Sequence, residues 1–238
     1  MRHIQRSLVL LALAGGVLLL GEPVAFAQQR YYGPAYAPPP GYHRGPAYAA
    51  PYYYGFHSHD GFFMRLDVGF GFMSASESFG GYTDTYSGSG VTYGAAFGGV
   101  VAPNLIIYGE VLGTTVFDPT YGVNDGNGSV VLSGVDMTMA GIGPGVAYYF
   151  EPINLYLSGT LTFNRISFSD SSSNYPYGDT SVGIGLSMMV GKEWWVGRDW
   201  GIGLAGQIHL ATMKDTPQGY DSRMNAAVFS LLFSATYN

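Results

Sequence analysis

From Phe62 to the end of the chain, apolar residues alternate one by one with small or polar residues. In the first such segment, FFMRLDVGFGFM, every second residue from Phe62 to Phe72 is apolar, while Arg65 and Asp67 belong to the other set. Successive side chains of a β-strand point to opposite faces, so this alternation predicts a strand with one apolar face. After residue 27 there is no run of about 18 apolar residues, the length that a transmembrane helix needs. We therefore predict an all-β domain.

The same alternation recurs seven more times, which predicts eight strands in all. The further apolar faces lie at 91–101, 105–117, 142–150, 155–163, 182–190, 200–210 and 227–238. Long polar links are expected at about 74–89, 118–134, 169–180 and 213–225, and tight turns at 102–104, 151–154 and about 195–199. Long loops at one rim and short turns at the other are typical of an up-and-down outer-membrane barrel.

The direction of the apolar faces separates two classes of barrel. These faces point inward to a ligand in a soluble lipocalin-like barrel and outward to lipid in a transmembrane barrel. Only 11% of the residues are charged, against roughly 25% in average soluble domains. The opposite face is rich in Gly, Ser, Thr and Ala and would make a poor water-facing surface. The composition therefore favours an eight-stranded antiparallel up-and-down transmembrane β-barrel.

The first 61 residues have a different character. Residues 1–27 place Arg2 and Arg6 before an apolar run and a small-x-small triplet, which is the order of a secretory signal peptide. Residues 28–61 are rich in Tyr, Pro, Ala and Gly without periodicity, which predicts a disordered periplasmic tether. The barrel domain is expected at 62–238. The chain has no cysteine, which excludes disulfides and thiol chemistry.

All three tryptophans lie in GKEWWVGRDWGIG, at 191–203, across one of the expected short turns. Aromatic rings with a polar tip favour the membrane–water interface, where one side is apolar and the other wet. We predict an aromatic girdle at this rim, with Lys192 and Arg198 reaching toward headgroups. A core corner or a ligand platform is the alternative. The predicted girdle comprises Tyr148, Tyr149, Phe150, Trp194, Trp195, Trp200 and Tyr237.

Residues 62–238 resemble the small eight-stranded outer-membrane barrels of the OmpA and OmpX type. The resemblance includes the alternating last strand, which here carries Phe229, Leu231, Phe233 and Tyr237. It implies that this strand is the signal for the barrel-insertion machinery. Such strands usually finish on Phe, whereas Asn238 is last here. OmpA-like proteins add a peptidoglycan-binding domain after the barrel, and we expect none in this chain.

The same resemblance implies the outer membrane of a Gram-negative bacterium, where lipid and lipopolysaccharide surround the barrel. The tether and the C-terminus are then expected in the periplasm and the long loops outside the cell. The sequence indicates no particular external partner. Its formal net charge of −6 argues against nucleic acid, because binding to nucleic acid favours basic surfaces.

Four charged residues, Arg65, Asp67, Glu110 and Glu193, fall on the inner face by parity and lie near the short turns. Side chains fill the interior of an eight-stranded barrel, and a buried charge is costly unless it is paired. We predict a cluster in which Arg65 bridges Asp67 and Glu110, with Glu193 as a further candidate, and which plugs the lumen. A wet, cation-selective path lined by the surplus carboxylates is the alternative.

The signals for metal binding or catalysis are weak. In HSHD, His57, His59 and Asp60 are candidate metal ligands, but a solvated hinge before the first strand is the favoured interpretation. Lipid A deacylases of the PagL type resemble this chain in size and strand count, and they use a His and a Ser two residues apart. Here His209 is followed at that spacing by Ala211. We expect no metal, no cofactor and no enzymatic activity.

A rigid scaffold that displays loops suits a structural role or surface interaction. The sequence therefore predicts a non-enzymatic outer-membrane barrel with a plugged lumen. A narrow channel for ions or small hydrophobic molecules is the first alternative, and a lipid A-modifying enzyme is the second.

Overall fold

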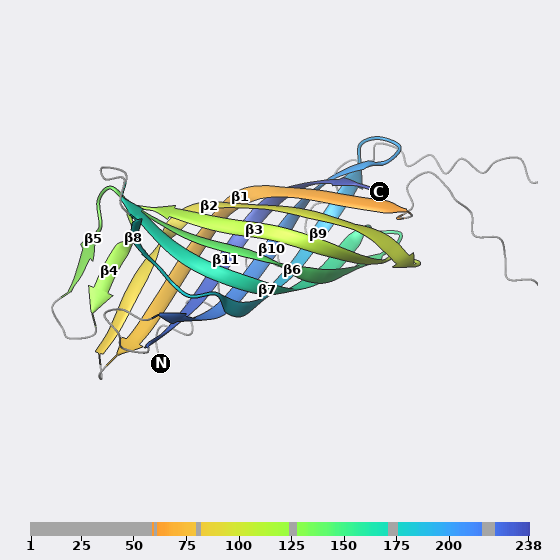
Figure 1. The fold of residues 1–238 in the computed structure, drawn as a ribbon. Coiled ribbons are helices and arrows are strands. Elements are labelled where there is room, and N and C mark those ends of the chain that lie inside the picture. The colour runs from red at the N-terminus through yellow and green to blue at the C-terminus, as the bar shows by residue number, and fades with distance from the viewer. Residues whose placement is uncertain (1–58, 60, 80–81, 124–127, 171–175, 216–221) are drawn as a thin grey trace, which may run out of the picture. The chain divides into compact units, whose positions relative to one another are not determined.

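Eight long strands pair in antiparallel fashion and close into a barrel in the computed structural model (Figure 1). They are β1 (Phe62–Phe79), β2 (Tyr82–Ala102), β3 (Leu105–Phe117), β6 (Val135–Phe150), β7 (Leu155–Asp170), β9 (Gly183–Trp195), β10 (Trp200–Asp215) and β11 (Ser222–Tyr237). Each pairs with the next long strand along the chain, and β1 pairs with β11 to complete the ring. The predicted all-β, eight-stranded antiparallel barrel is therefore confirmed.

The structure describes residues 59, 61–79, 82–123, 128–170, 176–215 and 222–238, all within one compact unit, Phe56–Asn238. The predicted signal peptide, most of the tether, His57 and Asp60 lie outside the described residues. None of the described residues forms a helix long and apolar enough to cross a membrane. Three short strands flank the ring, β4 (Thr120–Val123), β5 (Ser129–Val131) and β8 (Pro176–Asp179).

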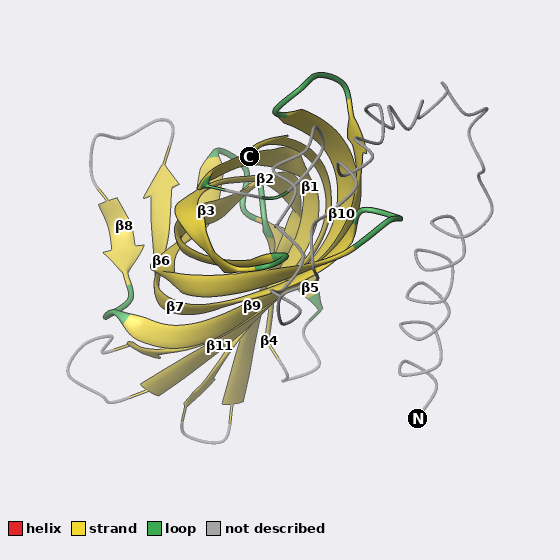
Figure 2. Ribbon diagram, turned by 90° about the vertical axis from the view of Figure 1, so that its right-hand side faces the viewer, coloured by secondary structure: helices red, strands yellow, loops and turns green. Residues whose placement is uncertain are grey.

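The apolar faces of the strands point outward, as predicted for a transmembrane barrel. On β1 the Leu66, Val68 and Phe70 side chains are exposed, Phe70 at 79% of its surface, whereas Arg65 and Asp67 are buried inside. The same arrangement repeats around the ring, whose strands curve about a common interior (Figure 2). Such an exterior would be unfavourable in water, so the lipocalin-like alternative is wrong.

Tight turns join the strands at one end of the barrel, which we call the short-turn rim. They lie at 103–104, 151–154 and 196–199, in agreement with the expected positions. The opposite end, where β1 joins β2, β3 joins β6, β7 joins β9 and β10 joins β11, is called the loop rim.

The strands extend farther toward the loop rim than the sequence predicts. β1 continues to Phe79 and β2 begins at Tyr82, so most of 74–89 is strand and not a long link. Strand also covers 169–170, 213–215 and 222–225, which lie inside the predicted links, and β6 begins at Val135, directly after another of these links. Along these extensions the polarity reverses: Met73 and Ala75 are buried inside, while Ser74 faces outward. Between the apolar belt and the loop rim, the barrel has a polar exterior and an apolar core, as water-soluble barrels have.

Candidate functional site

The most unusual feature of the lumen is Arg65, a fully buried arginine on β1. Its Nε lies 3.0 Å from Oδ2 of Asp67, and its Nη2 lies 3.4 Å from Oε1 of Glu110 on β3. Oε2 of Glu110 also accepts a hydrogen bond of 2.5 Å from the Thr160 hydroxyl on β7. The guanidinium therefore joins the two carboxylates expected beside it, one on its own strand β1 and one on β3.

Aromatic rings enclose the same guanidinium. Its carbon Cζ lies 5.2 Å from the ring centre of Tyr156, 5.6 Å from that of Tyr108 and 5.9 Å from that of Phe63. A cation over an aromatic face is stabilised by the ring quadrupole, by about 0.5–2 kcal/mol. These three residues were not predicted as part of the cluster, although each lies on the inner face by parity. Together with Asp67 and Glu110 they surround the Arg65 guanidinium.

Two glycines make room for this aromatic cage. A Cβ atom on Gly145 would lie 2.4 Å from the Tyr108 ring, and one on Gly191 would lie 2.5 Å from the Tyr156 ring. These separations are far shorter than van der Waals contact. The inward-facing glycines of β6 and β9 are thus the sequence signal for large side chains that cross the lumen.

We expect Gly191→Ala to lower the free energy of unfolding by about 1–3 kcal/mol, because the Tyr156 ring must leave its place over Arg65. Urea titration of the refolded protein checks this value. Gly109→Ala is the matched control, since no atom lies within 4 Å of a Cβ at that position. Equal midpoints for the two variants would contradict the close packing of Tyr156.

The third carboxylate, Glu193 on β9, lies apart from Arg65. Its Oε1 accepts hydrogen bonds from the Tyr149 hydroxyl at 3.2 Å and from the Thr236 hydroxyl at 2.6 Å. No ion pair joins it to Arg65, and its Oε2 has no hydrogen-bond partner among the described residues. Neutral donors on β6 and β11 therefore hold Glu193, and it is not part of the Arg65 bridge.

An aromatic group inside the short-turn rim corrects three expectations. His59, expected in a solvated tether, is buried, and its ring lies 3.6 Å from that of Tyr149 and 5.3 Å from that of Trp195. Its Nε2 lies 2.8 Å from Oδ1 of Asn154 in the turn before β7. Tyr149 is fully buried and does not belong to an exterior girdle, and Trp195 packs against His59. Parity explains the positions of Tyr149 and Trp195. Each follows a predicted girdle residue directly on its strand, and adjacent residues of one strand point to opposite faces.

The remaining girdle residues lie on the outside of the rim. Tyr148 packs edge-on against Phe150 at 5.0 Å, and Trp200 packs edge-on against Tyr237 at 5.4 Å. Phe62, which the sequence analysis did not include, lies 6.3 Å from Tyr237. Nζ of Lys192 lies 5.6 Å from the ring centre of Trp194. Arg198 is exposed and lies 3.7 Å from Asp199.

Hydroxyl and amide groups fill the middle of the lumen. Thr92 contacts Thr114 at 2.9 Å and Ser230 at 3.0 Å, which links β2, β3 and β11. Nε2 of His209 lies 3.1 Å from the Thr162 hydroxyl, and both side chains are buried. This pair has the atoms of a base and a nucleophile, but the described residues place no carboxylate against His209 to orient it. Its burial favours a lumen-filling role.

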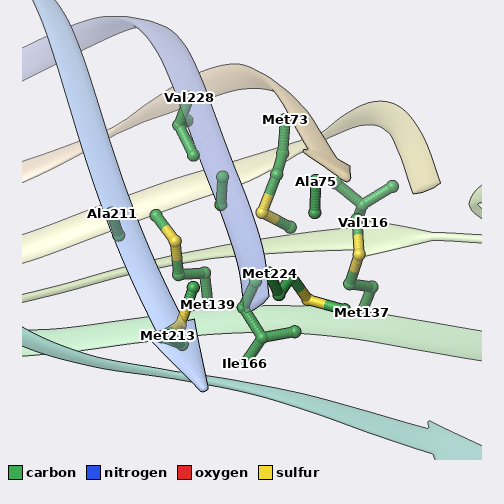
Figure 3. Packing of buried hydrophobic residues seen from close by; sticks show 11 residues of the cluster. Met73, Ala75, Val116, Met137, Met139, Ile166, Ala211, Met213, Met224 and Val228 are labelled. Carbon is green, nitrogen blue, oxygen red and sulfur yellow. The ribbon is translucent and has the colours of Figure 1, made fainter. Parts of the chain in front are cut away.

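Near the loop rim the lumen contains a buried apolar cluster that was not predicted, which we call the methionine cap (Figure 3). It contains five of the nine methionines of the chain, all buried, and side chains from six strands point into it. Its members are Met73, Ala75, Val116, Met137, Met139, Ile166, Ala211, Met213, Met224, Ala226 and Val228. Flexible thioether chains fill irregular spaces well. The cap therefore fills the lumen near the loop rim with apolar side chains.

The last strand has the expected face. Phe229, Leu231 and Phe233 are exposed on the exterior of β11, and Tyr237 lies at its end. Asn238 is buried, and its backbone N–H donates to the Asp199 carbonyl oxygen at 3.0 Å. The final residue thus packs on the turn between β9 and β10.

Among the described residues, no three His, Asp or Glu side chains come together in a way that could hold a metal ion. His59 is engaged by Asn154, Tyr149 and Trp195, as given above. The suggested partners His57 and Asp60 lie outside the described residues.

The sequence matches no protein-family model and no curated protein. The structure is similar to Neisserial surface protein A, with 16% identity and a TM-score of 0.49, over 75% of this chain and 97% of that one. It is also similar to the outer membrane protein OprG of Pseudomonas aeruginosa, with 16% identity and a TM-score of 0.45, over 76% and 98% of the two chains. The outer membrane protein AlkL matches with 13% identity and a TM-score of 0.43, over 83% and 97%. These likenesses concern the fold and not the function.

Three observations agree on the class of structure. Eight antiparallel strands close on themselves, the belt around them is apolar, and side chains of the opposite parity fill the interior. The described chain is a small eight-stranded β-barrel of the outer-membrane type.

Proposed function

We propose that this protein is a non-conducting outer-membrane barrel with a structural or surface-interaction role. The observation that carries the proposal is that the lumen is filled at two levels. Arg65 with its carboxylates and aromatic cage occupies the part near the short-turn rim, and the methionine cap occupies the part near the loop rim. A barrel closed in this way offers its loops, and not its lumen, for interaction.

The orientation of the barrel belongs to the same proposal. The short-turn rim faces the periplasm and the loop rim faces the exterior, because short turns on the periplasmic side and longer loops outside are the rule for such barrels. The aromatic pairs Tyr148–Phe150 and Trp200–Tyr237 then lie at the inner interface. Lipid and lipopolysaccharide surround the belt, and β11 is the strand that the insertion machinery engages.

Planar-bilayer conductance of the refolded protein tests the proposal. We expect no steady current at potentials at which porins conduct, because buried side chains occupy the lumen at both levels. Resistance to protease in parallel liposomes, together with the gel shift of folded barrels on heating, establishes that silent protein is inserted. Steady cation-selective conductance would overturn the proposal and favour a path lined by Asp67, Glu110 and Glu193.

A channel for small hydrophobic molecules is the second candidate. It is favoured by the apolar character of the methionine cap, whose flexible side chains could part for an apolar solute more readily than for an ion. Uptake of N-phenyl-1-naphthylamine by Gram-negative cells that express the protein distinguishes the two. A closed barrel leaves the rate equal to that of cells without it, whereas a hydrophobic channel raises the rate.

A further inference from the structure

The exterior of β10, β11 and β1 changes character in regular steps toward the loop rim. The register aligns outward-facing residues of these strands in rows of three. From the membrane belt toward the rim, the rows are Ile208, Phe229 and Phe72; Leu210, Ala227 and Ser74; Thr212, Asn225 and Ser76; Lys214, Arg223 and Ser78. Within a few residues the surface thus passes from apolar through hydroxyl and amide groups to cationic.

A shallow, open depression of about 640 Å³, which we call the larger hollow, lies in this exterior wall. Leu161, Ile184 and Leu186 of the neighbouring strands β7 and β9 form its apolar side, and they are exposed. The small side chains of Ser74 and Ala227 leave the space open. Ser76, Thr212 and Asn225 also line this hollow. A second hollow of about 400 Å³ lies between Ser78, Lys214, Ser222 and Arg223.

Lys214 and Arg223 are directly opposite each other on β10 and β11, and both are exposed. Like charges in this position destabilise a sheet unless something compensates them. Neither forms an ion pair among the described residues, whereas Arg165 near the same rim lies 2.5 Å from Asp179. Residues 62–238 contain only six basic residues, which are Arg65, Arg165, Lys192, Arg198, Lys214 and Arg223. Two of the six are therefore adjacent at one point, where an anion would relieve their repulsion.

We propose that this strip binds one phosphorylated lipid of the outer leaflet, namely the lipid A part of lipopolysaccharide. An acyl chain would lie in the larger hollow, the polar linkage beside Thr212 and Asn225, and a phosphate between Lys214 and Arg223. A guanidinium donates paired hydrogen bonds to phosphate oxygens, and an ammonium adds a compact charge. The inference rests on the outward orientation of the loop rim proposed above.

Native mass spectrometry of the detergent-refolded protein with diphosphoryl lipid A tests this inference. We expect retention of one lipid molecule, and at least about tenfold weaker retention by K214Q/R223Q, because two charge-assisted contacts are lost. Phosphatidylethanolamine, which carries no net charge, should be retained weakly by both. Inorganic phosphate should not displace lipid A, because it cannot occupy the apolar hollow.

Two control variants separate the contributions. K192Q/R198Q removes the same number of charges from the opposite rim and should retain lipid A like the parent protein. Ala227→Phe fills the hollow while leaving both cations, and it should weaken retention. If the two double variants lost lipid A retention equally, the cause would be general electrostatic attraction of lipid A to the protein, and the inference would be overturned. Full retention by Ala227→Phe, or displacement by inorganic phosphate, would reveal a simple anion site and also overturn it.

The outcomes remain distinct from those for the closed barrel. Lys214 and Arg223 lie on the exterior, so K214Q/R223Q should be as silent in planar bilayers as the parent protein. A conducting parent that retains lipid A would overturn only the closed-barrel proposal. A silent parent that does not retain it would overturn only this inference.

Discussion

Arg65→Ala should lower the free energy of unfolding by about 3–5 kcal/mol, because it leaves Asp67 and Glu110 buried without their cation. The aromatic cage adds to the loss, since Tyr156 and Tyr108 then face a cavity. Urea titration in lipid vesicles measures the change. Tryptophan emission is a suitable signal, because all three tryptophans lie close to this end of the barrel.

A neutral version of the cluster is the control for Arg65→Ala. In R65M/D67N/E110Q the three charges are removed together and the side-chain volumes are nearly kept. Most of the stability lost in Arg65→Ala should therefore return, because replacing a whole buried ion pair costs far less than removing one partner. A loss below about 1 kcal/mol in Arg65→Ala would mean that water already solvates the carboxylates. That result would favour the wet cation path over the plug.

Met137→Ala should lower the free energy of unfolding by about 2–5 kcal/mol, since it opens a cavity in the methionine cap. The side chain is fully buried and points into the cluster with Met73 and Met224 (Figure 3). The same urea titration in vesicles measures the change. A small effect would indicate that the upper lumen is wet and loosely filled.

Two further variants control for Met137→Ala. Met137→Leu nearly keeps the volume and should cost less than about 1.5 kcal/mol. Met188→Ala removes a methionine from the exterior, where the side chain is 44% exposed, so lipid can fill the space and the loss should be small. If Met188→Ala cost as much as Met137→Ala, burial in the cap would not be the cause.

In the proposed closed barrel, the two filled levels of the lumen lie one after the other along the barrel. Arg65 and its partners fill the part near the short-turn rim with paired charge, and the methionine cap fills the part near the loop rim with apolar side chains. A variant that disrupts one level leaves the other in place. We therefore expect a barrel with either change alone to remain closed to ions as long as it stays folded.

The inward side of the strands could be assigned from sequence, because a strand alternates faces with a period of two residues. That rule places Arg65, Asp67 and Glu110 inside, and the structure brings these three together. The same rule, applied residue by residue, excludes Tyr149 from an exterior girdle that contains Tyr148. The girdle prediction included both because it relied on the position along the strand and not on parity.

Other contacts could not be predicted, since they join residues far apart in the chain. Parity places Glu193 in the lumen but does not reveal whether it meets Arg65 or, as found, Tyr149 and Thr236. The partner depends on the stagger of β6, β9 and β11, which the whole ring determines. The stacking of His59 on Tyr149 is likewise a contact between a segment without periodicity and a distant strand.

Local patterns in the sequence were sufficient to predict the eight strands of the barrel and their short turns, and composition was sufficient to predict the outward direction of the apolar belt. The short strands β4, β5 and β8 were not predicted. The extent of the strands and the side chains that fill the upper lumen depend on contacts that form only when the ring closes. Beyond Phe72 the polarity reverses while the strand continues, so the local pattern resembles a polar loop. The methionine cap exists only because ring closure brings side chains of six strands, each with one to three members, into a shared interior.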